Sequence, residues 1–263
     1  MSIPHLLIVA HGSRSKAWNN AVVEFAAQAD AACRETGVFS GASAGFMEHG
    51  RPSITGAIAS LSQSNTHVTA QPLFLSVSQH VTVDIPNEFA RAAQAFGATN
   101  GQAQYQHNGC VFTLLPPPQA PELLAQNAAR RIQSNIRLTS DDGVIFVYYG
   151  TKSYIAAWDA LAQATINEMQ SQFAGVKMTW AYAGDMAGFS PDPLAKAIDE
   201  MAQHCRRVVI LPALVAKSVI QNEVIPAAVQ NAQSGKQAVY FYDAVLPDPV
   251  LAKQFSDIAA RQI

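Results

Sequence analysis

Cysteine and charge are scarce in this sequence. The three cysteines, Cys33, Cys110 and Cys205, are odd in number and show no CxxC spacing, which argues against a disulfide framework and a structural zinc site. Charged residues make up 14% of the chain, and the formal net charge is −2 at pH 7. Lysine and arginine are scattered, so the chain lacks the basic field that DNA or RNA binding requires.

Long apolar runs are also missing. No stretch approaches the ~18 apolar residues needed to cross a bilayer, and no basic segment precedes the short apolar run near the N-terminus. We therefore expect a cytoplasmic protein with no membrane partner. Hydrophobic residues nevertheless make up 49% of the 263 residues, enough to bury the core of one large α/β domain or of two smaller ones.

Short apolar runs alternate with longer segments of helical period. "LLIVA" precedes the helical segment 15–33, "HVTAQPLFL" precedes 81–96, and "VFTLL" precedes 121–132. Four further strand-like runs follow after residue 143. This alternation predicts crossover connections and parallel sheets that are covered by helices on both faces.

The chain contains an internal repeat. "PLFLSVSQHVTVDIP" from Pro72 matches "PALVAKSVIQNEVIP" 140 residues later, and "LLIVAHGSRS" from Leu6 matches "VIFVYYGTKS" 138 residues later. "AARRI" at Ala128 matches "AARQI" 131 residues later. Matches in the same order at nearly constant offset predict two homologous α/β halves, 1–138 and 139–263.

Two kinds of segment could join these halves. We expect the junction at "LTSDDG" (138–143), because it is polar and rich in turn-forming residues. The Pro-rich "LLPPPQAP" (114–121) has a counterpart, "VLPDPVLA" (245–252), inside the second half. We therefore interpret both as turns into the last helix of each half, with Pro121 in a first helical turn.

Three polar residues follow predicted strands of the first half. His11 ends the first strand, Glu48 comes just after the second, and His80 follows the third. Ligands bind at the carboxyl ends of parallel strands, so these side chains are candidates for one site. Two imidazoles and a carboxylate suit Fe²⁺, Co²⁺, Ni²⁺ or Zn²⁺ and leave coordination positions open. The competing interpretation is that each is a hydrogen-bonded or surface residue.

The repeat offers an internal comparison for these positions. The second half has Tyr149 in place of His11, Gly188 in place of Glu48 and Ile220 in place of His80. Glycines, prolines and apolar positions are kept between the halves, whereas the histidines are not. This difference favours a site in the first half only.

Two hydrolytic alternatives fit the sequence less well. "GASAG" (41–45) matches the GxSxG pattern of a serine hydrolase, but such a serine needs a helix directly after it, and Ser43 is expected inside a strand. A histidine phosphatase would need an arginine directly before the His-Gly pair, where Ala10 stands.

The motifs "LLIVAHGSR", "FMEHGRPSI" and "PLFLSVSQHVTVDIP" resemble the sirohydrochlorin chelatases, the class II cobalt and iron chelatases of cobalamin and sirohaem biosynthesis. The resemblance implies two flavodoxin-like, three-layer αβα halves with a metal-dependent site in the cleft between them. It implies a lyase that inserts a metal into a tetrapyrrole, with His11 and His80 contacting the metal and Glu48 nearby. No His-rich tail or Cys cluster points to metal storage or an iron–sulfur centre.

On this hypothesis His11 and His80 hold Co²⁺, Fe²⁺ or Ni²⁺ as the substrate, and no organic cofactor is needed. A neutral histidine or Glu48 accepts the pyrrole protons. The tetrapyrrole carries many carboxylates, and the expected contacts to them, which could equally be solvated surface charges or helix caps, are Ser13, Arg14, Arg51, Lys152 and Lys217. The alternative function is a non-catalytic carrier or sensor of a tetrapyrrole or metal. The sequence does not indicate the oligomeric state.

Overall fold

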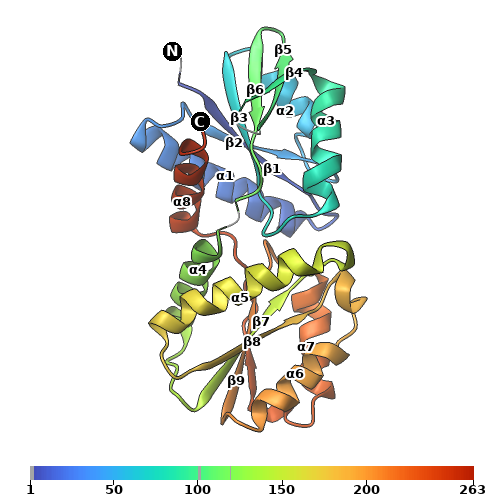
Figure 1. Cartoon of the computed structure of the whole chain (residues 1–263), viewed down its shortest axis with the longest axis vertical. Helices are drawn as coiled ribbons and strands as arrows, with labels where there is room; N and C mark the ends of the chain where they lie inside the picture. Colours follow the sequence, from blue (N-terminus) through green and yellow to red (C-terminus); the bar gives the residue numbers. More distant parts are fainter. Residues whose placement is uncertain (1–2, 100–101, 119) are drawn as a thin grey trace. The chain divides into compact units, whose positions relative to one another are not determined.

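A computed structural model describes residues 3–99, 102–118 and 120–263. The chain divides into two compact units, the first formed by Met1–Pro118 with Pro247–Ile263 and the second by Gln119–Leu246. Each unit is a β-sheet covered by helices, which confirms the predicted α/β fold class (Figure 1). Within the described ranges, no helix is both long and apolar enough to cross a bilayer.

The sheet of the first unit has six strands in the order β2-β1-β3-β6-β5-β4. Four are parallel, namely β1 (His5–Ala10), β2 (Ala42–Phe46), β3 (His67–Pro72) and β6 (Cys110–Leu114). β4 (Gln94–Thr99) and β5 (Gln102–His107) add an antiparallel hairpin at one edge.

This hairpin corrects the prediction of a helix across 81–96. The helical segment ends at Ala92, and Gln94 already begins β4. The two added strands have few β-branched residues, so their own sequence signals them weakly. Pairing with β6 and the packing of Tyr105 on Phe89, with ring centroids 5.3 Å apart, hold them in place.

Helices cover both faces of the first sheet (Figure 1). α2 (Ile54–Leu61) and α3 (Ile85–Ala92) pack on the face that carries Leu7 and Val9. α1 (Lys16–Thr36) packs against α8 (Pro249–Ala260), where the rings of Phe25 and Phe255 lie 5.6 Å apart, edge to face. A five-residue π-helical turn, η1 (His80–Asp84), leads into α3.

The second unit contains a four-stranded parallel sheet in the order β10-β9-β7-β8. Its strands are β7 (Asp142–Tyr148), β8 (Lys177–Tyr182), β9 (Arg207–Pro212) and β10 (Ala238–Tyr240). Its helices are α4 (Pro121–Asn135), α5 (Ile155–Gln172), α6 (Asp192–Ala202) and α7 (Ile225–Asn231), with the short turns η2 (Lys152–Tyr154), η3 (Asp185–Ala187), η4 (Ile220–Val224) and η5 (Gly235–Gln237).

The two units repeat one local design. The π-helical turns η1 and η4 both continue into a helix that begins with Ile-Pro, at Ile85 and Ile225. Gly12 and Gly150 both follow an inner strand with positive φ, at 89° and 66°. These shared features agree with the predicted duplication.

The boundaries of the units differ from the expected halves 1–138 and 139–263. Each unit takes its last helix from the other half of the sequence, since α4 packs against α5 in the second unit and α8 packs against α1 in the first. The division therefore falls at the two Pro-rich segments, and 138–143 lies inside the second unit. Pro121 and Pro249 do begin their helices, as expected for the first of them.

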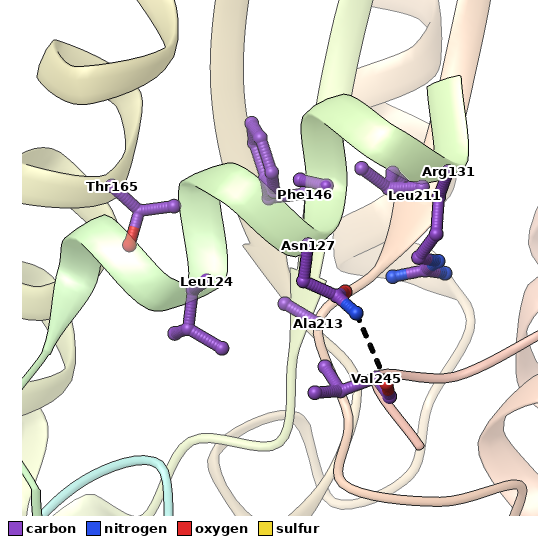
Figure 2. A pocket seen from close by; sticks show the side chains of 9 residues that line it. Leu124, Asn127, Arg131, Phe146, Thr165, Leu211, Ala213 and Val245 are labelled. Carbon is purple, nitrogen blue, oxygen red and sulfur yellow. Dashed lines mark hydrogen bonds between the residues drawn. The ribbon is translucent and has the colours of Figure 1, made fainter. Parts of the chain in front are cut away.

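Polar contacts within the second unit explain why α4 belongs there (Figure 2). Asn127 donates to the Val245 carbonyl oxygen at 3.1 Å. Arg131, whose side chain is only 10% exposed, donates to the Pro212 carbonyl oxygen at 2.8 Å and to the Asp243 carboxylate at 3.0 Å. These residues surround a cavity of only about 10 Å³, so the helix fits closely against the sheet.

Candidate metal site

His11 and His80 lie side by side at the carboxyl edge of the first sheet. His11 directly follows β1, and His80 begins the π-helical turn η1 after β3. Because β1 and β3 are adjacent and parallel, both loops start at the same edge. The two imidazole rings are 4.5 Å apart between centroids, with an interplanar angle of 75°. The structure thus brings together two residues that are distant in sequence.

Hydrogen bonds orient both imidazoles in the same way. His11 Nδ1 is 2.7 Å from the Gly12 carbonyl oxygen, and His80 Nδ1 is 2.8 Å from an Asp84 carboxylate oxygen. A carbonyl or carboxylate oxygen accepts a proton, so Nδ1 is the donor in both rings. In the neutral form this leaves the Nε2 lone pair of each ring available to a metal ion.

Asp84 is a site residue that the sequence analysis missed. It follows His80 by four residues in the π-helical turn, and both side chains are partly exposed, at 35% for Asp84 and 41% for His80. The signal was present in "HVTVD", because residues four apart on a helical turn meet. A carboxylate bound to the far nitrogen of a metal-binding histidine fixes the ring and raises its basicity.

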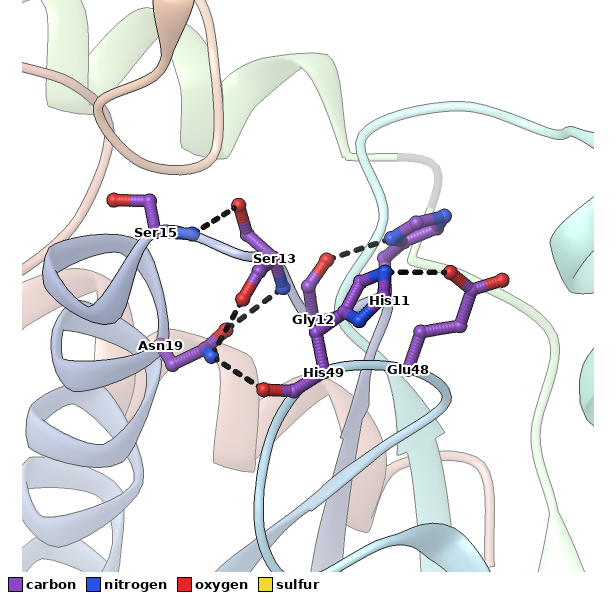
Figure 3. A network of polar contacts seen from close by, with 7 residues as sticks. All are labelled: His11, Gly12, Ser13, Ser15, Asn19, Glu48 and His49. Atoms are coloured by element: carbon purple, nitrogen blue, oxygen red, sulfur yellow. Dashed lines mark hydrogen bonds and ion pairs between the residues drawn. The ribbon is translucent and has the colours of Figure 1, made fainter.

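Glu48 is close to His11 through its main chain. Its N–H donates to the His11 carbonyl oxygen at 2.8 Å, but its carboxylate lies 3.3 Å from His49 Nε2 (Figure 3). Within the part of the chain that the structure describes, no three His, Cys, Asp or Glu side chains form a group that could hold a metal. The expected set of two imidazoles and Glu48 is therefore not formed, and the candidate donors are the two imidazoles.

Gly12 and Asn19 hold the loops after β1 and β2 together (Figure 3). Gly12 has a φ of 89°, and a Cβ atom there would overlap the Glu48 carbonyl oxygen, so the close approach requires glycine. The Asn19 side chain accepts from Ser13 N–H and donates to the Ser13 and His49 carbonyl oxygens, at 2.8, 2.8 and 3.0 Å. Asn19 was not identified from sequence, because its partners come from two loops.

The expected roles of the hydroxyls after the two glycines need correction. Ser15, not Ser13, caps α1 by accepting from Trp18 N–H. Ser13 accepts from Ser15 N–H, and its own N–H is already bonded to Asn19, which leaves that amide no proton for a ring carboxylate. In the second unit, Thr151 accepts from the indole N–H of Trp158 at 3.2 Å and caps no helix through its side chain.

The four expected cationic contacts are all exposed but do not lie together. Arg14 belongs to the loop that follows His11. Arg51 lines a groove of about 510 Å³ with described residues of α1, β2 and α2, which do not include the two imidazoles. Lys152 and Lys217 lie in the second unit. Among the described residues, neither lysine ammonium group is found in an ion pair.

The equivalent edge of the second sheet has no imidazole pair. Tyr149 replaces His11, and Ile220, only 1% exposed, replaces His80. The position equivalent to Glu48 is Gly184, not Gly188, because Gly184 N–H donates to the Tyr149 carbonyl oxygen just as Glu48 N–H donates to that of His11. Burial, and then the Asp185 carboxylate, raise the pKa of the Tyr149 phenol, which therefore stays neutral.

Ser43 lies within β2, as predicted, and a loop separates that strand from α2. Its hydroxyl is 3.0 Å from His5 Nε2. Burial is the main cause that lowers the pKa of His5, against an opposing effect of Asp30. The strand-to-helix turn of a serine hydrolase is therefore missing at Ser43, which removes the main support for that alternative.

Residues 5–117 match the family model CbiX, which confirms the resemblance expected from the motifs of the first half. No curated protein gives a significant match.

Several solved structures share the fold over nearly the whole chain. SirB from Bacillus subtilis with Fe³⁺ is 18% identical, with a TM-score of 0.73 over 97% of this chain and 94% of SirB. The sirohydrochlorin chelatase SirB from Bacillus subtilis subspecies spizizenii in complex with cobalt is 17% identical, with a TM-score of 0.69 over 99% and 95%. CbiX, the terminal enzyme for biosynthesis of siroheme in denitrifying bacteria, is 18% identical, with a TM-score of 0.62 over 97% and 98%. At these identities the likeness establishes the chelatase fold.

Proposed function

We propose that the protein inserts a divalent metal ion into sirohydrochlorin or a related tetrapyrrole, as a lyase of cobalamin or sirohaem biosynthesis. The observation that carries the proposal is the His11–His80 pair, with both Nε2 lone pairs available at the edge of the sheet. The CbiX match over residues 5–117 includes both histidines, and the solved SirB structures with Fe³⁺ and with cobalt share the fold.

The donor set suits a metal that must leave again. Two neutral imidazoles bind Co²⁺, Fe²⁺ or Ni²⁺ but leave most coordination positions to water or to an incoming ligand. The pyrrole nitrogens can then displace the imidazoles one at a time. A dedicated third protein ligand would oppose that transfer, and none is formed among the described residues.

Insertion also requires acceptors for two pyrrole protons. We assign the first acceptor to an imidazole of the pair, once it has released the metal, with Asp84 stabilising the protonated His80. The second is Glu48, whose side chain is 49% exposed beside His49 and can pass a proton to solvent. No organic cofactor takes part in these steps, and we place the reaction in the cytoplasm.

The test is metallation of sirohydrochlorin by the whole protein. Metal-free sirohydrochlorin and Co²⁺ or Fe²⁺ are incubated with catalytic amounts of protein, and the product is followed by its absorption spectrum. We expect multiple turnovers by the wild type and a loss of more than about 100-fold in His11→Ala and His80→Ala, since each removes a direct metal donor. The control is His204→Ala, which removes an exposed imidazole of the second unit.

A carrier or sensor would give a different result. It would bind one equivalent of metal or tetrapyrrole without turnover, and the histidine variants would lower stoichiometric binding only. Product formation no faster than without protein would overturn the proposed function.

A further inference from the structure

A cluster of exposed apolar side chains lies at the carboxyl edge of the second sheet. Tyr149, Met186 and Phe189, called here the aromatic edge, are 37%, 38% and 44% exposed. The rings of Tyr149 and Phe189 are 5.9 Å apart between centroids and meet edge to face. Tyr149 occupies the position that His11 occupies in the first unit, so the aromatic edge stands where the repeat places the metal-binding imidazole.

The backbone holds this cluster in place at an energetic cost. Phe189 has a φ of 56°, in the left-handed region that bulky residues rarely adopt, and yet its ring is not buried in return. Its N–H donates to the Gly184 carbonyl oxygen at 3.0 Å, and Gly184 N–H donates to the Tyr149 carbonyl oxygen at 2.9 Å. Strained residues held by their surroundings are concentrated at ligand sites.

Glycine at position 184 also serves the cluster. A Cβ atom there would collide with the Tyr149 ring, so the ring can lie over the loop only because residue 184 has no side chain. Met186 N–H donates to the Gly150 carbonyl oxygen at 3.2 Å, which fixes the same loop to the segment after β7. The aromatic edge is therefore a preformed surface.

Charges at the same edge are suited to an anionic ligand. Lys152 follows β7 in η2, and Lys217 follows the adjacent strand β9; both are exposed. Neither ammonium group is found in an ion pair among the described residues. One acid opposes them, since the Asp185 carboxylate accepts from the Lys152 main-chain N–H at 3.3 Å. A ligand with a broad apolar face and peripheral carboxylates matches this combination.

We propose that the aromatic edge binds the flat face of the tetrapyrrole substrate, while Lys152 and Lys217 bind its carboxylates. The inference rests on the proposed function and divides it between the units: the first supplies the metal donors, and the second supplies a surface for the ring. Loss of imidazoles from the second half is then the change that produced a ring-binding surface.

The test separates ring binding from metal binding. Metal-free sirohydrochlorin is titrated into the whole protein and binding is read from its absorption change, while Co²⁺ is titrated separately without the ring. We expect Tyr149→Ala and Phe189→Gly to weaken ring binding on the order of tenfold, with unchanged Co²⁺ affinity. Phe189→Gly relieves the strained backbone, so a loss of binding by this variant cannot result from misfolding.

Three comparisons sharpen the result. Tyr149→Phe keeps the ring and is expected to bind nearly as the wild type does. Phe96→Ala removes a 54% exposed aromatic residue of the first unit and is expected to change nothing. Lys152→Ala and Lys217→Ala are expected to weaken binding by a factor that shrinks as salt is added.

The outcomes distinguish this inference from the proposed function. If the wild type metallates sirohydrochlorin but Tyr149→Ala and Phe189→Gly bind the ring as tightly as it does, the aromatic edge is not the ring-binding surface and the proposed function stands. If the wild type binds the ring but does not metallate it, and these variants lose binding, the inference stands and the proposed function fails. If the wild type does not bind the ring, both fail.

Discussion

The carboxyl edges of the two sheets have the same backbone but different chemistry. Gly12 and Gly150 turn the chain after the inner strands, and η1 and η4 lead into the same Ile-Pro helix start. The first edge presents two oriented imidazoles, whereas the second presents exposed aromatic rings. The difference shows that the scaffold depends on backbone conformation and apolar packing, while the chemistry depends on a few side chains at strand ends.

The second edge differs from the first by more than one substitution. Ile220, which replaces His80, is buried in the core of its unit. The position of Asp84 corresponds to Val224, which is also buried. The hydrogen-bonded pair that orients His80 is therefore replaced as a whole by apolar packing, and no partly metal-binding state remains.

The largest expected effects test the exchange of terminal helices. Phe255→Ala, in α8, is expected to destabilise the first unit by about 3–5 kcal/mol, because Phe255 is 3% exposed and packs on Phe25. Ile132→Ala, in α4, is expected to cost the second unit about 2–5 kcal/mol. Hydrogen exchange should show lost protection in α1 for the first variant and in α5 for the second. The reverse pattern would assign each helix to its own half.

The next effect compares the two equivalent glycines. An alanine at either position meets a left-handed backbone, which costs about 1–2 kcal/mol. In Gly12→Ala the new Cβ also overlaps a main-chain oxygen of Glu48, whereas in Gly150→Ala it meets the Tyr182 side chain, which can rotate. We expect a lower denaturation midpoint for Gly12→Ala than for Gly150→Ala, with weaker Co²⁺ binding in the former only. Equal midpoints would mean that the two turns do not differ.

Asp84→Asn tests the residue that orients His80. An amide can still accept from Nδ1 but lacks the negative charge, so Co²⁺ affinity is expected to fall about 10- to 100-fold. Glu223→Gln, on the equivalent turn η4, is the matched control and should leave Co²⁺ binding unchanged. Isothermal titration of Co²⁺ measures both variants. An unchanged Kd in Asp84→Asn would show that the carboxylate does not act through His80.

The smallest expected effect is a null result at the second edge. Tyr149→His restores an imidazole at the position of His11, but its neighbour is still the buried Ile220. We therefore expect the Co²⁺ stoichiometry measured by dialysis to equal that of the wild type. A second bound equivalent would show that one imidazole suffices, and that the paired arrangement at the first edge is not essential.

Much of the candidate site could be predicted from sequence because its residues follow strands. The apolar runs before His11 and before the His80 loop place both residues at the same edge of a parallel sheet, which the structure confirms. Glu48 also follows a strand, but its carboxylate is next to His49, because a strand end fixes the main chain and leaves the side-chain direction to neighbouring loops.

The sequence alone determined the alternation of strands and helices, the internal repeat and the two histidines, because each depends on local periodicity or on residues next to strand ends. It did not determine which sheet α4 and α8 cover, or that a weakly signalled hairpin extends the first sheet. Those features depend on contacts between distant segments, such as Phe255 on Phe25 and Arg131 with Asp243. An apolar helix face packs equally well on either copy of a duplicated sheet, and only the assembled cores distinguish the two.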